Sequence, residues 1–153
     1  MANLSCKKIE GLIHKYSNIS RRKRGLNSLK GNYGLKKLAR NHSWKMAKSK
    51  HIWHGEGVHL AKSNITSKGI LDFLISLFYS GCSGENVAMM PLGRVKGFRH
   101  PINNSNDVAL AFHKSWMGSQ GHRRNILNGS FNLIGVGVKK RGRYYYATQI
   151  FYG

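Results

Sequence analysis

One carboxylate, Glu85, stands out among the residues that could take part in chemistry. The chain has 5 Asp and Glu against 26 Lys and Arg, and Glu85 lies between a small, polar run at residues 81–84 and an apolar run at residues 86–90. A carboxylate at the entry to an apolar strand needs a compensating partner, because burying an unpaired charge is costly. That partner could be a cation, a histidine, backbone N–H groups or a metal ion. The simpler alternative is a glutamate that only accepts N–H bonds from a turn.

The chain also has eight histidines, and an isolated histidine is more often a packing or surface residue than a ligand. His42 falls on an apolar helix face, so we expect it to be a hydrogen-bonded core residue. No partner pattern surrounds His14, His51, His100 or His113, and these four are expected to take no part in chemistry.

The most specific stretch is residues 116–128, which read WMGSQGHRRNILN. Residues 84–88 read GENVA, residues 38–47 read LARNHSWKMA, and the C-terminal runs read IGVGV at 134–138 and YYYATQIF at 144–151. In this order, over residues 8–152, the motifs resemble the CAP superfamily (cysteine-rich secretory proteins, antigen 5 and pathogenesis-related 1 proteins). They are most similar to its compact prokaryotic-type members, which carry the pattern W-M-x-S-x-G-H-R-x-N-I-L.

This resemblance implies an α+β fold, a three-layer α-β-α sandwich with a central antiparallel sheet (the SCP fold) and a large central cleft. It also implies a cleft tetrad of two histidines and two acids. His54 matches the first histidine, Glu85 the first acid and His122 the second histidine. Ser119 occupies the position of the second acid, a departure that weakens a protease-like interpretation. Glu56 could supply a carboxylate instead.

The implied cleft suggests a divalent metal site, with Zn²⁺ or another divalent cation as the one expected cofactor. Neutral imidazoles are good Zn²⁺ ligands, so the candidate metal ligands are His54 and His122. Typical sites use three or four protein ligands, and two histidines would give an open, weak site completed by water. Glu85 could orient a histidine or act as a general base. Ser119 is a conceivable nucleophile, but its place in the family pattern favours a structural or water-binding role.

Two function classes follow. The first is a secreted-type binding protein whose cleft, lined by His54, Glu85, Ser119 and His122, holds a divalent metal or a small or lipid ligand. The alternative is a metal-assisted hydrolase, protease- or esterase-like, with both histidines on the metal and Glu85 as base. The missing second acid and the incomplete ligand set favour the binding protein.

The formal net charge of +21 predicts a strongly basic surface that attracts polyanions. An anionic polymer or a membrane surface is therefore the expected partner, with a merely solubilising surface as the alternative. Nucleic acid is not expected, because the basic residues are spread along the chain and no aromatic stacking motif accompanies them.

Cysteine usage and the N-terminus bear on the compartment. Cys6 and Cys82 match no metal motif, and they could form a disulfide in an oxidising compartment or remain two thiols. The first eight residues contain no apolar signal-peptide core, whereas the family resemblance implies an extracellular or cell-envelope location.

The elements that must position these residues are four helices and a β-rich C-terminus, which we expect to form one domain over residues 1–153. Apolar spacing predicts helices at residues 4–18, 33–50 and 65–79, and a fourth that starts at residue 105 or 106. A short strand is expected at residues 86–90, and a hairpin at residues 132–140 and 143–152.

Overall fold

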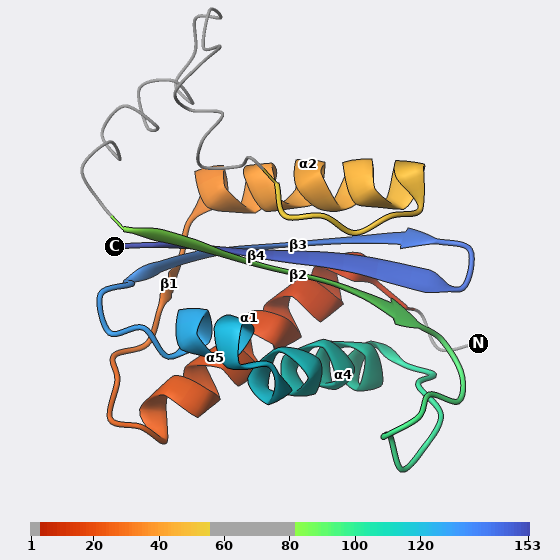
Figure 1. Ribbon diagram of the computed structural model, residues 1–153, viewed down its shortest axis with the longest axis horizontal. Helices are drawn as coiled ribbons and strands as arrows, with labels where there is room; N and C mark the ends of the chain where they lie inside the picture. The colour runs from red at the N-terminus through yellow and green to blue at the C-terminus, as the bar shows by residue number, and fades with distance from the viewer. Residues whose placement is uncertain (1–3, 56–81) are drawn as a thin grey trace, which may run out of the picture.

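The computed structural model describes residues 4–55 and 82–153, which form three layers (Figure 1). One face of the sheet is covered by helix α2 (Tyr33–Ser49), and the other by α1 (Cys6–Arg22), α4 (Ser105–Gly118) and α5 (Gln120–Ile126). The strand order is β1 (Lys30–Gly31), β3 (Leu133–Arg141), β4 (Tyr144–Tyr152) and β2 (Ser83–Pro91). The three long strands are antiparallel, while β1 runs parallel to β3. The predicted three-layer α+β sandwich is confirmed.

The ends of several elements differ from the prediction. Helix α1 continues to Arg22 instead of ending near residue 18, and β2 extends beyond residues 86–90 at both ends. Helix α4 begins at residue 105 as predicted, but its cap is Asn104, whose side chain accepts a hydrogen bond from the Asp107 N–H. Neither β1 nor α5 was predicted, and the helix expected at 65–79 lies outside the described residues. No helix in residues 4–55 and 82–153 is long and apolar enough to cross a membrane.

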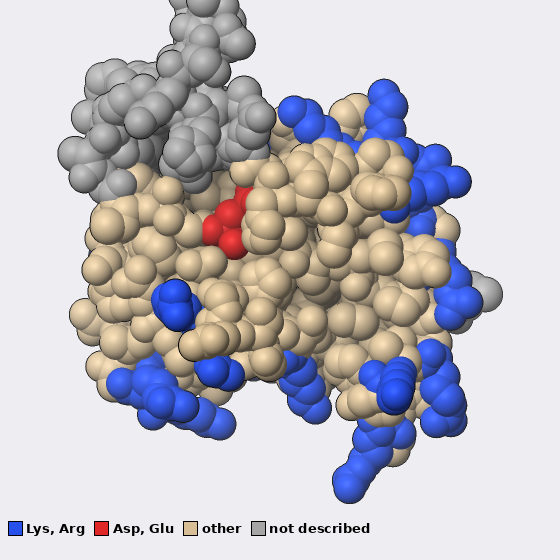
Figure 2. All heavy atoms as spheres, viewed as in Figure 1, with Lys and Arg blue, Asp and Glu red and all other residues tan. Residues whose placement is uncertain are grey.

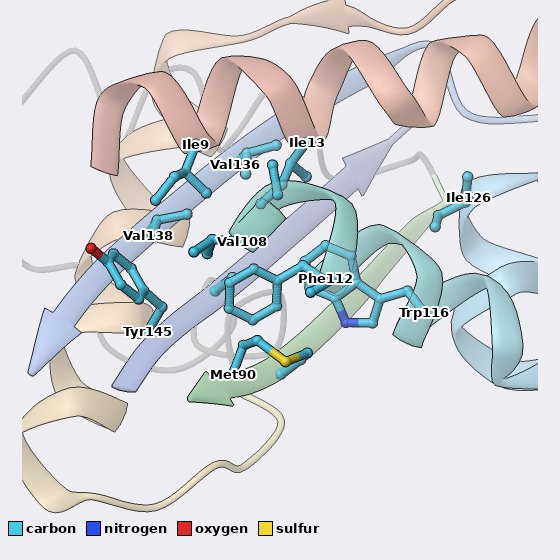
Figure 3. Packing of buried hydrophobic residues seen from close by; sticks show 14 of the residues in the cluster. Ile9, Ile13, Met90, Val108, Phe112, Trp116, Ile126, Val136, Val138 and Tyr145 are labelled. Atoms are coloured by element: carbon cyan, nitrogen blue, oxygen red, sulfur yellow. The ribbon is translucent and has the colours of Figure 1, made fainter. Parts of the chain in front are cut away.

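The larger apolar core fills the space between the sheet and helices α1 and α4. Side chains from both helices and from the long strands point toward one another there (Figure 3). Phe112 and Trp116 of α4 stack with ring centroids 5.5 Å apart, and both are fully buried. Burying a side chain of this size contributes about 1.5–3 kcal/mol. This packing anchors α4, which leads directly into α5 and His122.

Two glycines in β3 let helix α2 lie directly against the sheet. A Cβ atom on Gly135 would come within 2.1 Å of the Leu35 carbonyl carbon, and one on Gly137 within 2.1 Å of the Arg40 nitrogen. The hydroxyl of Ser43 donates to the Gly137 carbonyl at 2.9 Å. Larger residues at these two positions would push the helix away. The glycines therefore fix α2, and with it the segment at residues 50–55 that follows.

Side chains also cap the sheet along β2 and along the part of β3 that extends beyond its short pairing with β1. At β2, the indole of Trp116 donates to the Val87 carbonyl at 3.2 Å, and Asn125 donates to the Glu85 carbonyl at 3.1 Å. At β3, the Val138 N–H donates to the Glu10 carboxylate at 3.1 Å. Outer strands otherwise present unpaired backbone groups, so these bonds complete the sheet and attach the helices to its edges.

Arg21 differs from the rest of the basic run that ends α1. Arg21 is only 1% exposed, whereas the basic residues at 22–24 are exposed. The guanidinium donates to four backbone carbonyls, those of Asn27, Ile126, Asn128 and Phe131. It thereby ties the end of α1 to the end of α5 and to the turn that precedes β3.

Candidate functional site

His54, Glu85 and His122 come from three separate segments and meet beside β2. His54 follows α2, Glu85 lies in β2 and His122 lies in α5. The Nδ1 atom of His54 is 3.4 Å from Glu85 Oε1. The rings of His54 and His122 have centroids 6.0 Å apart and are tilted by 34°. The structure therefore brings together the three side chains that the sequence analysis placed in one site.

Glu85 lies near the start of β2, where it is paired with Ile150 of β4. Its side chain is 11% exposed, and the backbone N–H of Gly55 donates to Oε1 at 2.7 Å. Within the described residues, both polar contacts of the carboxylate fall on Oε1. On the face shown in Figure 2, acidic atoms are visible in one recess, while Lys and Arg atoms lie around the periphery. A backbone N–H and a histidine are thus the partners that the described part of the chain gives this carboxylate.

The two histidines differ in their surroundings. Burial, and then the nearby charge of His54, lower the pKa of His122 below its ordinary value. His122 is therefore a neutral imidazole near pH 7, the form that binds a metal ion or accepts a proton. The side chain of His54 is 65% exposed. His122 is therefore partly buried, whereas the side chain of His54 largely faces solvent.

A buried polar network, which the sequence analysis missed, fixes α5 against β2. Asn86 donates to the His122 carbonyl at 3.0 Å and to the Gln149 side chain at 3.1 Å. Asn125 donates to the Asn86 side chain at 2.9 Å and, as described above, to the Glu85 carbonyl. The available signal was Asn86, a fully buried amide in an otherwise apolar run. Because buried amides need partners, this network determines where His122 sits relative to Glu85.

His42 holds the segment that carries His54. As predicted, it is buried and hydrogen-bonded, with Nε2 donating to the Trp53 carbonyl at 2.9 Å. Gly55 lies between His42 and Glu85. A Cβ atom at Gly55 would come within 2.9 Å of the His42 ring and 3.0 Å of Glu85 Oε2. The absence of a side chain at Gly55 therefore lets His54 and Glu85 approach each other.

Ser119 and Glu56 complete the predicted set. Ser119 is the residue between α4 and α5, and its side chain makes no capping hydrogen bond. Its hydroxyl makes no hydrogen bond to His122 within the described part of the chain, so a Ser119 nucleophile activated by that histidine receives no support from the geometry. Glu56 lies outside the described residues.

The remaining described histidines lie away from this site. His14 donates from Nε2 to the Leu29 carbonyl at 2.9 Å, and His113 shares a hydrogen bond of 2.8 Å with Ser20. The Nδ1 atom of His113 is buried without a partner among the described residues. The side chains of His51 and His100 are exposed.

Cys6 and Cys82 are two separate thiols. Cys6 contacts the backbone of Lys140, and burial raises the pKa of its thiol. Cys82 directly precedes β2, at the far end of the sheet from Lys140, which pairs with Tyr145. Nine strand residues at about 3.3 Å each span roughly 30 Å, whereas a disulfide needs Cα atoms within about 7 Å. The geometry rules out a bond between these two cysteines.

The donors at the site suit a metal ion in type but are few in number. Imidazole nitrogen and carboxylate oxygen are both ordinary Zn²⁺ ligands. Among residues 4–55 and 82–153, however, no three His, Cys, Asp or Glu side chains are grouped closely enough to hold a metal ion. His54, Glu85 and His122 would have to close in by a small movement, with water completing the coordination.

Comparison with known proteins places this chain in a family. The sequence profile of the cysteine-rich secretory protein family, CAP, matches residues 15–151. The uncharacterized protein YkwD of Bacillus subtilis (strain 168) is 32% identical over 145 residues, which are 94% of this chain and 47% of YkwD. The chain thus spans about half the length of this relative.

Solved structures show the same fold. An extracellular protein of Bacillus anthracis that contains an SCP domain superimposes with a TM-score of 0.59 at 25% identity, covering 94% of this chain and 39% of that one. An outer surface protein of Borrelia burgdorferi superimposes with a TM-score of 0.65 at 17% identity, covering 99% and 98% of the two chains. The second likeness spans nearly the whole of both proteins.

Proposed function

Because the chain belongs to the cysteine-rich secretory protein (CAP) family, we propose that it is an extracellular binding protein. Its site at His54, Glu85 and His122 holds a divalent cation or a small or lipid ligand, and its basic surface meets anionic partners. The extracellular location is supported by the extracellular SCP-domain protein and the outer surface protein that share its fold.

One observation carries the proposal for the site. Three polar side chains from distant segments converge within a few ångströms at a sheet edge, and one of them is a histidine whose pKa is lowered. Outside such sites, a protein with few acidic residues gains little by placing a carboxylate beside one histidine that in turn contacts a second. A perturbed titratable group that lies among other polar side chains in one recess is typical of functional sites.

Zn²⁺ is the cation that best fits these donors. His54 and His122 would hold it through imidazole nitrogens, and Glu85 would hold an imidazole or a water in place. A bound Zn²⁺ supplies Lewis-acid polarisation of the groups it contacts. NaASP2, a structural neighbour at a TM-score of 0.57 and 12% identity, has been crystallised with Zn²⁺.

Calorimetric titration with Zn²⁺ tests the site. We expect the wild type to release or absorb heat with a single-site isotherm, and His54→Ala and His122→Ala each to weaken binding by about tenfold or more, because each removes a ligand. His51→Ala is the matched control, since His51 is exposed and lies three residues from His54. Equal loss in the control, or no heat with the wild type, would contradict the proposal.

A metal-assisted hydrolase at the same site is the second candidate. The observation in its favour is the Glu85 carboxylate beside His54, with the neutral imidazole of His122 next to that histidine. Such a set of groups can activate a water. A screen of peptide and ester substrates with added Zn²⁺ would compare the wild type with Glu85→Gln. Turnover that falls at least about a hundredfold in Glu85→Gln would support general-base catalysis, and equal turnover in both proteins would end the hydrolase interpretation.

A further inference from the structure

The outer face of helix α2 carries a stripe of basic and aromatic side chains. Its inner face is buried against the sheet through Leu35, Ala39 and Met46 among others. On the opposite side lie Tyr33, Lys37, Trp44 and Lys48, whose spacings of four, seven and four residues place them on one line along the helix. We call these four residues the α2 ridge. At 1.5 Å per residue the ridge is about 22 Å long.

The aromatic residues of the ridge are exposed rather than packed. Tyr33 is 74% exposed and Trp44 is 46% exposed. The ammonium group of Lys48 lies 5.3 Å from the centroid of the Trp44 ring, a cation–π distance. A single exposed aromatic residue is common on protein surfaces, but exposed aromatic rings that share one helix face with lysines are an arrangement found at interaction and membrane surfaces. The pairing with Lys48 keeps a positive charge beside the apolar ring.

The charge around the ridge has one sign. Residues 33–55 contain no Asp or Glu. Figure 1 shows α2 alone among the described helices on its side of the sheet, and Figure 2 shows basic side chains projecting beyond that layer. The basic residues of this stretch are Lys36, Lys37, Arg40, Lys45, Lys48 and Lys50. Arg40 is paired with Glu10, and the lysines remain to attract an anionic surface.

We propose that the α2 ridge is the docking surface for an anionic lipid membrane. The lysines contact the headgroup phosphates and carboxylates, while Trp44 and Tyr33 enter the interfacial layer, where amphipathic rings of this kind gather. A convex ridge fits the plane of a bilayer, whereas proteins that follow a single polyanionic strand use a groove. The inference deepens the proposed function and rests on its assignment of anionic partners to the basic surface.

A second basic cluster on the molecule supplies the control. Arg22, Lys23 and Arg24 at the end of α1 are exposed, but none of the large exposed apolar side chains lies in that run. If charge alone decided membrane binding, the two clusters would contribute equally. If the ridge is the docking surface, only changes on α2 matter.

Vesicle sedimentation with the full chain tests the proposal. The vesicles contain either phosphatidylserine and phosphatidylcholine or phosphatidylcholine alone. We expect binding to the anionic vesicles, a loss of about tenfold or more in Lys37→Ala/Lys48→Ala, a comparable loss in Trp44→Ala, and less than about twofold loss in Lys23→Ala/Arg24→Ala. The Trp emission should shift to the blue on binding in the wild type and shift less in Trp44→Phe. Thermal unfolding of each variant checks that it is folded.

Three other results would each overturn the inference, and they can be told apart. Equal vesicle binding by all variants would exclude the α2 ridge as the docking surface, but it would leave the basic surface as a whole as a site for anionic partners. Binding to soluble polyphosphate or single-stranded nucleic acid, without binding to vesicles, would assign the surface to a polymer. Binding to no polyanion would end both the inference and the proposed anionic partners, and the Zn²⁺ titration would still test the site independently.

Discussion

Two of the five acidic residues, Glu10 and Glu85, lie at opposite edges of the same sheet and have different partners. Glu10 is 3% exposed, and both of its oxygens accept hydrogen bonds from Arg40, at 2.6–3.1 Å. The Val138 N–H adds a further bond. Glu85 is 11% exposed and, among residues 4–55 and 82–153, has one backbone N–H and a histidine at 3.4 Å, both on a single oxygen.

The difference shows how the same side chain becomes structural at one edge and available at the other. A guanidinium is permanently charged and matches both carboxylate oxygens, so it leaves Glu10 no capacity for a ligand. A histidine changes its charge near neutral pH and binds through one atom at a time. Glu85 therefore keeps capacity for a cation or a water, while Glu10 closes the β3 edge.

Removing Glu10 should have the largest effect on stability. Glu10→Ala leaves the Val138 N–H and part of the Arg40 side chain without partners. We expect a loss of about 2–4 kcal/mol in the free energy of unfolding, less than for a fully buried pair because Arg40 is 42% exposed. Urea unfolding measures this loss. A loss below about 1 kcal/mol would show that the two edges do not differ as described.

The pH of these unfolding measurements matters as well, because the buried His113 titrates differently in the folded and the unfolded chain. Burial lowers the pKa of His113 from 6.5 to about 4. Between these values the unfolded chain binds more protons than the folded one, so stability is complete above about pH 6.5 and falls as the pH drops toward 4. The expected loss is at most about 3 kcal/mol. Unfolding of the wild type and His113→Gln from pH 7 to pH 4 checks it, and an equal decline in both would exclude His113 as the cause.

Gly55→Ala should disturb the β2 edge alone. The added Cβ would press on the His42 ring and on Glu85 Oε2, so we expect a loss of about 1–2 kcal/mol in stability together with weaker Zn²⁺ binding. Gly11→Ala is the control, since nothing lies within 4 Å of a Cβ there. If Gly55→Ala were destabilised but bound Zn²⁺ as well as the wild type, the position of residues 51–55 would not matter for Zn²⁺ binding.

Glu85→Gln should have the smallest effect on stability and a clear effect on binding. The amide oxygen can still accept the Gly55 N–H, so we expect less than about 1 kcal/mol of change in unfolding. Zn²⁺ affinity should fall by about tenfold or more, because the charge beside the histidines is lost. Urea unfolding and calorimetry on the same preparations compare the two. A large stability loss with unchanged affinity would make Glu85 a structural residue like Glu10.

Sequence reasoning reached the site because its residues lie in local motifs. A recognisable pattern surrounds His122 and Glu85, and His54 has the spacing that the pattern requires. The structure places these three side chains close together. Glu10 and Arg40 carry no such pattern. They are ordinary charged residues on two helices, and their pairing depends on how those helices pass the edge of β3. Asn86 was visible as a polar residue in an apolar run, but its partners were not.

The sequence by itself indicated the layered α+β fold, because apolar periodicity is a local property of the chain and because its local motifs resemble those of the CAP family. It also identified which three side chains could share a site. Only the tertiary structure decided the surroundings of each, the lowered pKa of His122, the burial of Arg21, and the separation of Cys6 from Cys82. The physical reason is that burial, pKa and hydrogen-bond partners arise from contacts between segments far apart in the chain, and no local pattern encodes those distances.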